Sequence, residues 1–447
     1  MKYIILGVAF AGIWPLYLLI RSSKILSQMI WVIVGLLPFV ATAISFSHAS
    51  IISVEWRGYA SGVEIQLIDL VALALLFTLK HKNPFFLHTP FVLFTIAVGA
   101  SVFQAEFQLP AIFAFWQMLK SYLLAYVVAR ASVEEGVAIG ILKGMAIGVV
   151  SQAVVVVYQK FAGGYIQPPG TFSHQNEMGL ALHFVLYPIM TLWLLAAPGH
   201  LWLVASLAGP AVVALIASRA TLGLSTVGLA LTFMVQSWWN WNLRKTLVIA
   251  SSGFLLSVFV PVAYKSFETR LSDSPIREDI YDERAAFARA ASAIASDHPF
   301  GIGANQYSYV VRTYGYALRA GVAPSEANLG NIVHNAYRLT AAETGYLGLV
   351  AFLIFLTMPL LTALRWGLPN RHLISGGLLT AMAISLTMVY VHAMFEWILF
   401  LSTPFYLLSM TFGMIYGLAY RTSMVRATER SKPPAVVPSY RAGRLIR

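Results

Sequence analysis

Long apolar runs that are almost free of charge recur along this chain and limit what it can fold into. A run of about 20 such residues is what an α-helix needs to cross the hydrocarbon core of a bilayer. Helices suit that core because they satisfy their own backbone hydrogen bonds. We therefore predict an all-α, polytopic integral membrane protein with about 12–13 transmembrane helices. The thirteen candidate runs lie at about 3–20, 28–46, 63–79, 89–104, 110–129, 137–158, 178–196, 201–218, 221–236, 246–263, 345–363, 373–391 and 398–417.

The composition excludes several other classes of protein. The chain is 58% hydrophobic and 11% charged, whereas a soluble domain is roughly 45–50% apolar and about 25% charged. A transmembrane β-barrel would alternate apolar and polar residues, but residues 246–262 are almost continuously apolar. The chain has no cysteine, which rules out disulfides, thiolate nucleophiles, cysteine-ligated zinc and iron–sulfur clusters.

The basic residues predict the orientation. They concentrate in short connections that alternate along the chain and in the tail 418–447, which holds seven basic residues and one acid. The positive-inside rule places these on the cytoplasmic side, and the net charge of +12 indicates anionic membrane lipid rather than nucleic acid as a partner. The stretch 264–344, with eight basic and nine acidic residues, then faces the periplasm. We divide the chain into N-terminal transmembrane helices (1–263), this periplasmic loop (264–344), C-terminal transmembrane helices (345–417) and a basic cytoplasmic tail (418–447).

Polar residues near the predicted membrane boundary gather on the outer side. Ionisable groups there are costly unless paired or solvated, so the cluster indicates a site at the outer leaflet. Within the long loop, residues 280–294 are typical of an amphipathic helix that ends at His298-Pro299, because proline cannot continue it. A second helix is predicted to begin near Asn331 and to enter the span that starts at Gly345. The outer polar residues are Arg57, His174, Gln175, Asn176, Glu177, Arg219, Arg284, His334, Asn335, Glu343, His392 and Glu396.

One spacing in this region is specific. His334-Asn335 is followed by nine residues and then by Gly345-Tyr346-Leu347-Gly348. With three further segments in register over roughly residues 165–365, this pattern resembles the bacterial O-antigen ligases and the related O-antigen and exopolysaccharide polymerases. The further segments are Gly170-Thr171-Phe172-Ser173-His174-Gln175-Asn176, Ser218-Arg219, and Arg284 with Asp297-His298-Pro299-Phe300-Gly301-Ile302-Gly303.

The resemblance implies an enzyme that transfers a glycan from an undecaprenyl-diphosphate carrier at the outer face of the bacterial inner (plasma) membrane. Arg219 and Arg284 are the predicted catalytic cations, because a guanidinium binds phosphate oxygens bidentately and stays charged. His334 is the predicted base for the proton of the attacking sugar hydroxyl. We expect no metal, no other cofactor, and inversion by single displacement. Alternatively, Arg219 snorkels at the membrane interface and Arg284 is a solvated helix residue.

Four more residues are candidates for substrate binding, namely His174, Asn176, Asn335 and Arg289. Three of them have a plainer interpretation as well. His174 and Asn176 are suited to cap the helix that follows them, and Arg289 is suited to a solvated helix face.

Two further groups receive structural interpretations. Lys120 lies well inside a predicted span, where an unpaired charge is costly, and Asp69 is its candidate partner. Gly345 and Gly348 are expected to be close-packing positions between helices rather than ligand contacts.

The acceptor separates two activities that share this donor chemistry. A lipid A–core acceptor would make the protein a ligase, and the end of another lipid-linked glycan would make it a polymerase. The histidine spacing favours the ligase, with the polymerase nearly level. A polysaccharide exporter or flippase would show inverted repeats and polar residues at the midplane, and the sequence shows no repeat. A structural scaffold of cell-envelope assembly is the remaining alternative.

Overall fold

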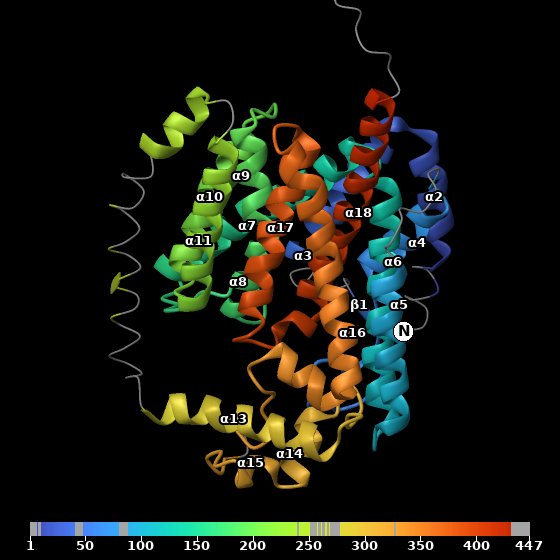
Figure 1. The fold of residues 1–447 in the computed structure, drawn as a ribbon, viewed down its shortest axis with the longest axis vertical. Helices are drawn as coiled ribbons and strands as arrows, with labels where there is room; N and C mark the ends of the chain where they lie inside the picture. The colour runs from blue at the N-terminus through green and yellow to red at the C-terminus, as the bar shows by residue number, and fades with distance from the viewer. Residues whose placement is uncertain are drawn as a thin grey trace, which may run out of the picture.

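The structure, a computed structural model, describes residues 10–40, 48–79, 88–238, 241–250, 278–325 and 328–430, with a few single positions elsewhere. It is mostly helical (Figure 1). The helices in the described ranges are α2 Ile13–Ser22, α3 Lys24–Val40, α4 Leu67–Leu76, α5 His88–Ser101, α6 Gln108–Ala131, α7 Glu135–Phe161, α8 Gln175–His183, α9 Leu186–Leu194, α10 Leu201–Leu215, α11 Arg219–Ser237, α13 Glu278–Asp297, α14 Tyr307–Thr313, α15 Tyr316–Arg319, α16 Ala336–Gly367, α17 Ile374–His392 and α18 Ser402–Arg430, with short 3-10 turns η2 Val102–Gln104, η3 Leu368–Asn370 and η4 Ile398–Phe400.

Six helical stretches in the described residues are long and apolar enough to cross a membrane, and four shorter apolar helices accompany them. The prediction of a helical, polytopic membrane protein is confirmed. Only residues 246–250 and a few single positions of the predicted run 246–263 belong to the described residues. The six stretches are Gln108–Ala131, Glu135–Phe161, Gln175–Leu194, Arg219–Ser237, Ala336–Asn370 and Ile374–His392.

Small residues allow the helices to pack closely. At Gly144 of α7, an added Cβ would lie 1.9 Å from the carbonyl oxygen of Val32 on α3. At Gly413 of α18, it would lie 2.7 Å from the carbonyl oxygen of Ala125 on α6. In lipid, where apolar burial between helices gains little, this close backbone approach is a main source of helix association.

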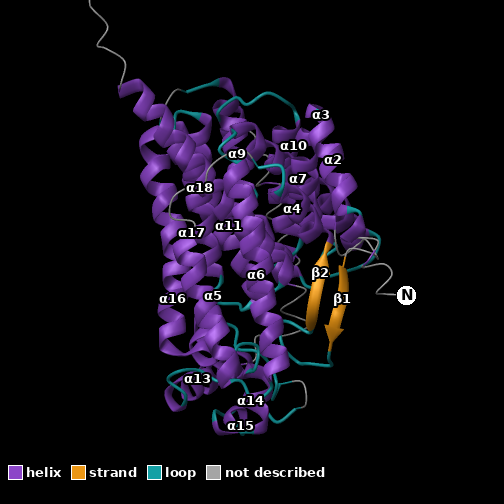
Figure 2. Cartoon of the chain, turned by 90° about the vertical axis from the view of Figure 1, so that its right-hand side faces the viewer, coloured by secondary structure: helices purple, strands orange, loops and turns teal. Residues whose placement is uncertain are grey.

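A short antiparallel hairpin interrupts the helical pattern (Figure 2). Strand β1 (His48–Ser53) pairs with β2 (Gly62–Gln66) in the register His48↔Gln66. The indole of Trp116 on α6 donates to the Glu64 carbonyl oxygen at 2.8 Å, which fastens the hairpin to the bundle. These strands were not predicted from the sequence.

The long loop forms a helical layer across one end of the bundle (Figures 1 and 2). The predicted helix 280–294 is α13, and it ends just before His298-Pro299 as expected. Ala286, Ala290 and Ile294 are buried, and Arg338 on α16 donates to the Ala288 carbonyl oxygen at 2.9 Å. The loop helix α13 is therefore held against the start of α16.

A break in α16 receives the turn that follows α13. Gly345 has φ 72°, and an added Cβ would lie 2.4 Å from the carbonyl carbon of Phe300. The Ile302 amide donates to Ala342 at 3.1 Å, and the Tyr346 amide donates to Pro299 at 3.0 Å. Gly345 is thus a close-packing position as predicted, but its neighbour is a loop rather than the predicted helix.

The predicted division into segments remains a prediction. The break at Gly345 coincides with the boundary drawn between residues 344 and 345. Helix α18 runs to Arg430, so the predicted tail 418–447 begins inside this helix. Residues 431–447 lie outside the described residues.

The buried lysine has the predicted partner. Lys120 Nζ lies 3.2 Å from Asp69 Oδ2, and Tyr406 donates its hydroxyl to Asp69 Oδ1 at 2.7 Å. Asp69 also accepts from the backbone amide of Gln66, the N-cap of α4. Because a buried charge needs a partner and hydrogen bonds, this group ties α4, α6 and α18 together.

Candidate active site

Glu396 is the centre of a cluster that joins four separate parts of the chain. It lies on the short connection between α17 and η4 and is 5% exposed. Its Oε2 lies 2.9 Å from His334 Nδ1. Its Oε1 accepts from Asn176 Nδ2 at 2.9 Å and from Arg284 Nη2 at 3.3 Å. The cluster thus brings together three predicted site residues around a carboxylate.

The carboxylate determines how His334 is oriented. An ionised carboxylate only accepts hydrogen bonds, so Nδ1 of His334 carries the hydrogen and Nε2 is the acceptor nitrogen. The side chain of His334 is 31% exposed. A histidine that is fixed through one nitrogen and whose side chain is partly exposed has the geometry of a general base.

The chain around His334 is held in place from both sides. Asn335 caps α16 by accepting from the Arg338 amide at 2.9 Å, and its Nδ2 donates to the Met394 carbonyl oxygen at 2.8 Å. The Ala336 amide donates to the Ala393 carbonyl oxygen at 2.9 Å. These contacts dock the start of α16 on the connection that carries Glu396.

The neighbouring groups keep Glu396 ionised. Burial raises the pKa of this carboxyl, but the hydrogen bond and charge of His334, together with the charges of Arg284 and His392, outweigh burial and hold the pKa below its ordinary value. An ionised Glu396 can therefore stabilise positive charge on His334.

The other predicted binding residues have structural partners. His174 caps α8, where its Nδ1 accepts from the Asn176 amide at 3.2 Å. Arg289 donates from Nε and Nη2 to the Ala320 carbonyl oxygen at 3.2 and 2.8 Å. Asn335 is the α16 cap described above. Contact of these three side chains with substrate remains a prediction.

Arg219 begins α11 and is exposed. Gln167 connects this region to α8, because it donates to the Ala217 carbonyl oxygen at 3.2 Å and accepts from Gln175 at 3.3 Å. Thr221 packs against Gly179 of α8. The starts of α8 and α11 are therefore neighbours, and Asn176 of the cluster lies on the first turn of α8. Among the described residues, Glu396 bonds Asn176, Arg284 and His334 but not Arg219.

The role of Glu396 was missed by the sequence analysis, which counted this residue only among the outer polar groups. A signal was available, since an acid in a short connection after a span is costly without partners. The sequence could not identify those partners, which lie 62, 112 and 220 positions away.

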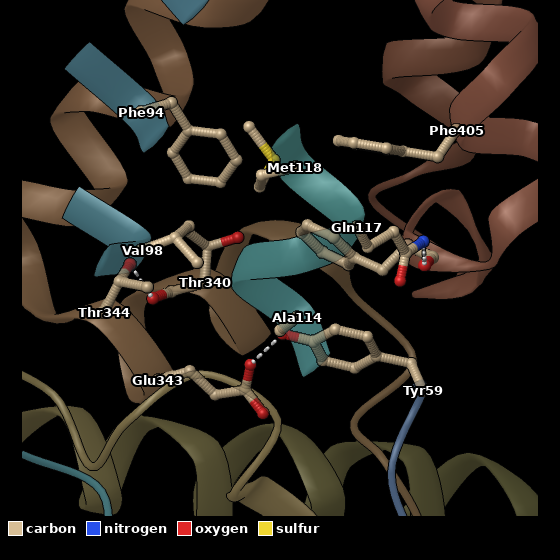
Figure 3. Close-up of a pocket in the computed structure, with 11 residues that line it drawn as sticks. Tyr59, Phe94, Val98, Ala114, Gln117, Met118, Thr340, Glu343, Thr344 and Phe405 are labelled. Atoms are coloured by element: carbon tan, nitrogen blue, oxygen red, sulfur yellow. Dashed lines mark hydrogen bonds between the residues drawn. The ribbon is translucent and has the colours of Figure 1, made fainter. Parts of the chain in front are cut away.

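A second buried carboxylate lies nearby, at the wall of a small cavity (Figure 3). Glu343 accepts from the Tyr59 hydroxyl at 2.8 Å and from the Tyr307 amide at 3.1 Å. The rest of the lining is mostly apolar and includes Phe94 and Phe405. No group of three or more potential metal ligands occurs within the described ranges, and metal independence remains a prediction.

Comparison with known families supports the resemblance seen in the sequence. Residues 203–353 match the family model described as O-antigen ligase, and this stretch includes Arg219, Arg284 and His334. No curated protein matches the chain. The resemblance is confirmed for this segment, which is similar to the O-antigen ligase family and lies in a multi-pass membrane protein. Members of this family are glycan-transferring enzymes that use lipid-linked glycans.

Proposed function

We propose that the protein transfers a glycan from an undecaprenyl-diphosphate carrier to a sugar hydroxyl at the periplasmic face of the bacterial inner membrane. The single observation that carries this proposal is the His334–Glu396 pair with Arg284 on the same carboxylate. A base and a cation thus lie together at one end of the helical bundle.

The reaction is a single displacement. The acceptor hydroxyl oxygen attacks the anomeric carbon, the bond from that carbon to the phosphate oxygen breaks, and its electron pair leaves with the diphosphate. The hydroxyl proton passes to Nε2 of His334. Glu396, bonded to Nδ1, stabilises the imidazolium that forms. One attack from the opposite face inverts the anomeric configuration.

The arginines serve the leaving group. Negative charge grows on the diphosphate as the bond breaks, so a fixed cation there stabilises the transition state more than the ground state. The Arg284 side chain is 49% exposed, and Arg219 is exposed at the neighbouring start of α11. Their forked guanidinium groups suit paired phosphate oxygens.

We propose the ligase type of acceptor, lipid A–core, because the histidine spacing favours it; the matched family covers both ligase and polymerase types of transfer. The test supplies purified protein with a lipid-linked oligosaccharide and either lipid A–core or a second lipid-linked glycan. Transfer to the first acceptor alone supports a ligase, and transfer to the second alone identifies a polymerase.

The variant for this test is His334→Ala, which should abolish transfer while the protein still folds. His298→Ala is the matched control, because His298 is an exposed histidine on the same loop and should leave transfer intact. If His334→Ala retains transfer, the proposed base is wrong.

The orientation is tested separately by labelling single introduced cysteines with an impermeant reagent. The native chain has no cysteine, and Phe300 is 67% exposed. Labelling from the periplasm at position 300 but not at position 440 supports the proposed sidedness, and the reverse pattern contradicts it.

A further inference from the structure

Glu396 holds both the proposed base and one proposed donor-binding cation. His334 occupies Oε2, and Arg284 shares Oε1 with Asn176. His334, which would act on the acceptor hydroxyl, and Arg284, which would act on the leaving diphosphate, thus compete for the charge of one buried carboxylate. In the structure, that single negative charge is neutralised by Arg284 whenever His334 is neutral.

The three partners of Glu396 are held with different firmness. Asn176 lies 2.9 Å from Oε1 on the first turn of α8, and His334 lies 2.9 Å from Oε2 next to the α16 cap. Arg284 is the most distant partner at 3.3 Å, and its side chain is 49% exposed. Arg284 can therefore leave without uncovering the carboxylate, since Asn176 remains on Oε1.

A diphosphate is the ligand that would draw Arg284 away. It offers several anionic oxygens, and a guanidinium binds two of them in parallel. The recorded contact to Glu396 uses only Nη2. Exchange of this one hydrogen bond for a two-bond contact with a more highly charged group favours the donor, and the buried charge of Glu396 that loses this cation is then left to His334.

We propose that Arg284 is a shared cation that couples donor binding to the base. In the empty protein it neutralises Glu396. When the donor diphosphate binds, Arg284 turns to it, and the full charge of Glu396 then acts on His334 alone. Glu396 is thus a positioning residue that strengthens the base only when a donor is present. This inference rests on the proposed function and adds to it the order in which the site is activated.

The coupling makes an unusual prediction for binding. Glu396→Gln keeps the size and an oxygen acceptor but removes the charge that competes for Arg284. This variant should bind farnesyl diphosphate about tenfold more tightly than the wild type. In the Arg284→Gln background, the same substitution should give no such gain, because there is no shared cation to release.

The experiment is a double-mutant cycle on the purified full-length protein in detergent, with farnesyl diphosphate as the probe and calorimetry as the readout. The four proteins are the wild type, Glu396→Gln, Arg284→Gln and the double variant. Glu106→Gln is the control, because Glu106 is an exposed carboxylate that accepts from Tyr309 and Tyr314 instead of an arginine. Its affinity for the probe should equal that of the wild type.

Two outcomes would overturn the inference. Equal or weaker binding by Glu396→Gln would show that the carboxylate does not compete for Arg284. An equal gain in the Arg284→Gln background would show a general effect of removing negative charge. If Glu396→Gln does not fold, Glu396→Asp, which withdraws the carboxylate from Arg284, replaces it with the same expected direction.

Turnover gives a second readout and separates this inference from the proposed function. With lipid-linked donor, Glu396→Gln should lower both kcat and KM, whereas loss of structure would lower activity without tighter donor binding. If Glu396→Gln gains no affinity for farnesyl diphosphate but transfer still depends on His334, the proposed function stands and the coupling is wrong. If Glu396→Gln binds the probe more tightly only when Arg284 is present, but the protein transfers no glycan, the coupling stands and the proposed function is wrong.

Discussion

Two buried glutamates on the loop side of the bundle have opposite surroundings. Glu343 is 3% exposed and Glu396 is 5% exposed. Glu343 accepts from a tyrosine hydroxyl and a backbone amide, both of which are neutral donors. Glu396 accepts from an arginine and an amide and is paired with a histidine.

The difference separates a structural carboxylate from a chemical one. Burial and the charge of Glu343 raise the pKa of the Tyr59 hydroxyl well above its usual value, so that Tyr59 remains a hydrogen-bond donor. The Tyr59–Glu343 bond therefore has a donor that keeps its proton at neutral pH. The partners of Glu396 include a histidine that can gain a proton and an arginine that can move. Equal burial is thus combined with neutral donors at Glu343 and with a titratable and a movable partner at Glu396.

The largest effect is expected when the charge of Glu396 is removed. Glu396→Gln should lower glycan transfer by roughly 10²–10⁴-fold, because His334 loses the charge that stabilises its imidazolium form. The melting temperature should fall only slightly, since the side-chain volume is kept. Transfer assays with thermal unfolding check both, and a destabilised but active variant would reverse the comparison.

Glu343→Ala should show the opposite pattern. It leaves the Tyr59 hydroxyl and the Tyr307 amide buried without their acceptor, at about 1–3 kcal/mol for each group. We expect a loss of about 2–5 kcal/mol in the free energy of unfolding. Transfer per folded molecule should change much less than in Glu396→Gln. A loss of transfer per folded molecule with an unchanged free energy of unfolding would instead show that Glu343 takes part in the reaction.

A smaller effect is expected when the geometry of the arginines changes but their charge does not. Arg284→Lys and Arg219→Lys should each lower transfer by about tenfold, because a lysine is a point charge and cannot bind two oxygens in parallel. Initial rates at saturating acceptor measure this. Wild-type rates would favour the snorkelling or solvated interpretation of that arginine.

The smallest effect concerns stability against pH. The pKa of Glu396 is lowered in the folded protein from its ordinary value of 4.5. Its contribution to stability is therefore present above pH 4.5 and is lost as pH falls through the lower, folded value. The difference in melting temperature between the wild type and Glu396→Gln should be larger at pH 7 than at pH 3.5. A constant difference would contradict the ionised assignment.

The sequence predicted the helical membrane class because that depends on local composition. Helix α13 and its end at His298-Pro299 were also predicted, since proline acts on its own neighbourhood. The motif identified His334 and Arg284. The energetic cost of an unpaired charge inside a membrane span suggested the Lys120–Asp69 pair. These inferences need little knowledge of long-range contacts.

The remaining features depend on contacts between distant segments. The role of Glu396 follows from partners on α8, α13 and α16. The positive φ of Gly345 follows from the turn after α13, which occupies the break in α16. The hairpin β1–β2 depends on Trp116 of α6. No local pattern of spacing or hydropathy contains this information.

The placement of Glu396 has a practical consequence for anyone who cuts or recombines this chain. The segment that matches the family, residues 203–353, contains His334 and Arg284, but their carboxylate and the amide that steadies it come from positions 396 and 176. A chimaera that exchanges only the matched segment would place His334 and Arg284 in another protein without the carboxylate that holds them. Grafts meant to alter sugar preference should therefore include the connection after α17 and the first turn of α8.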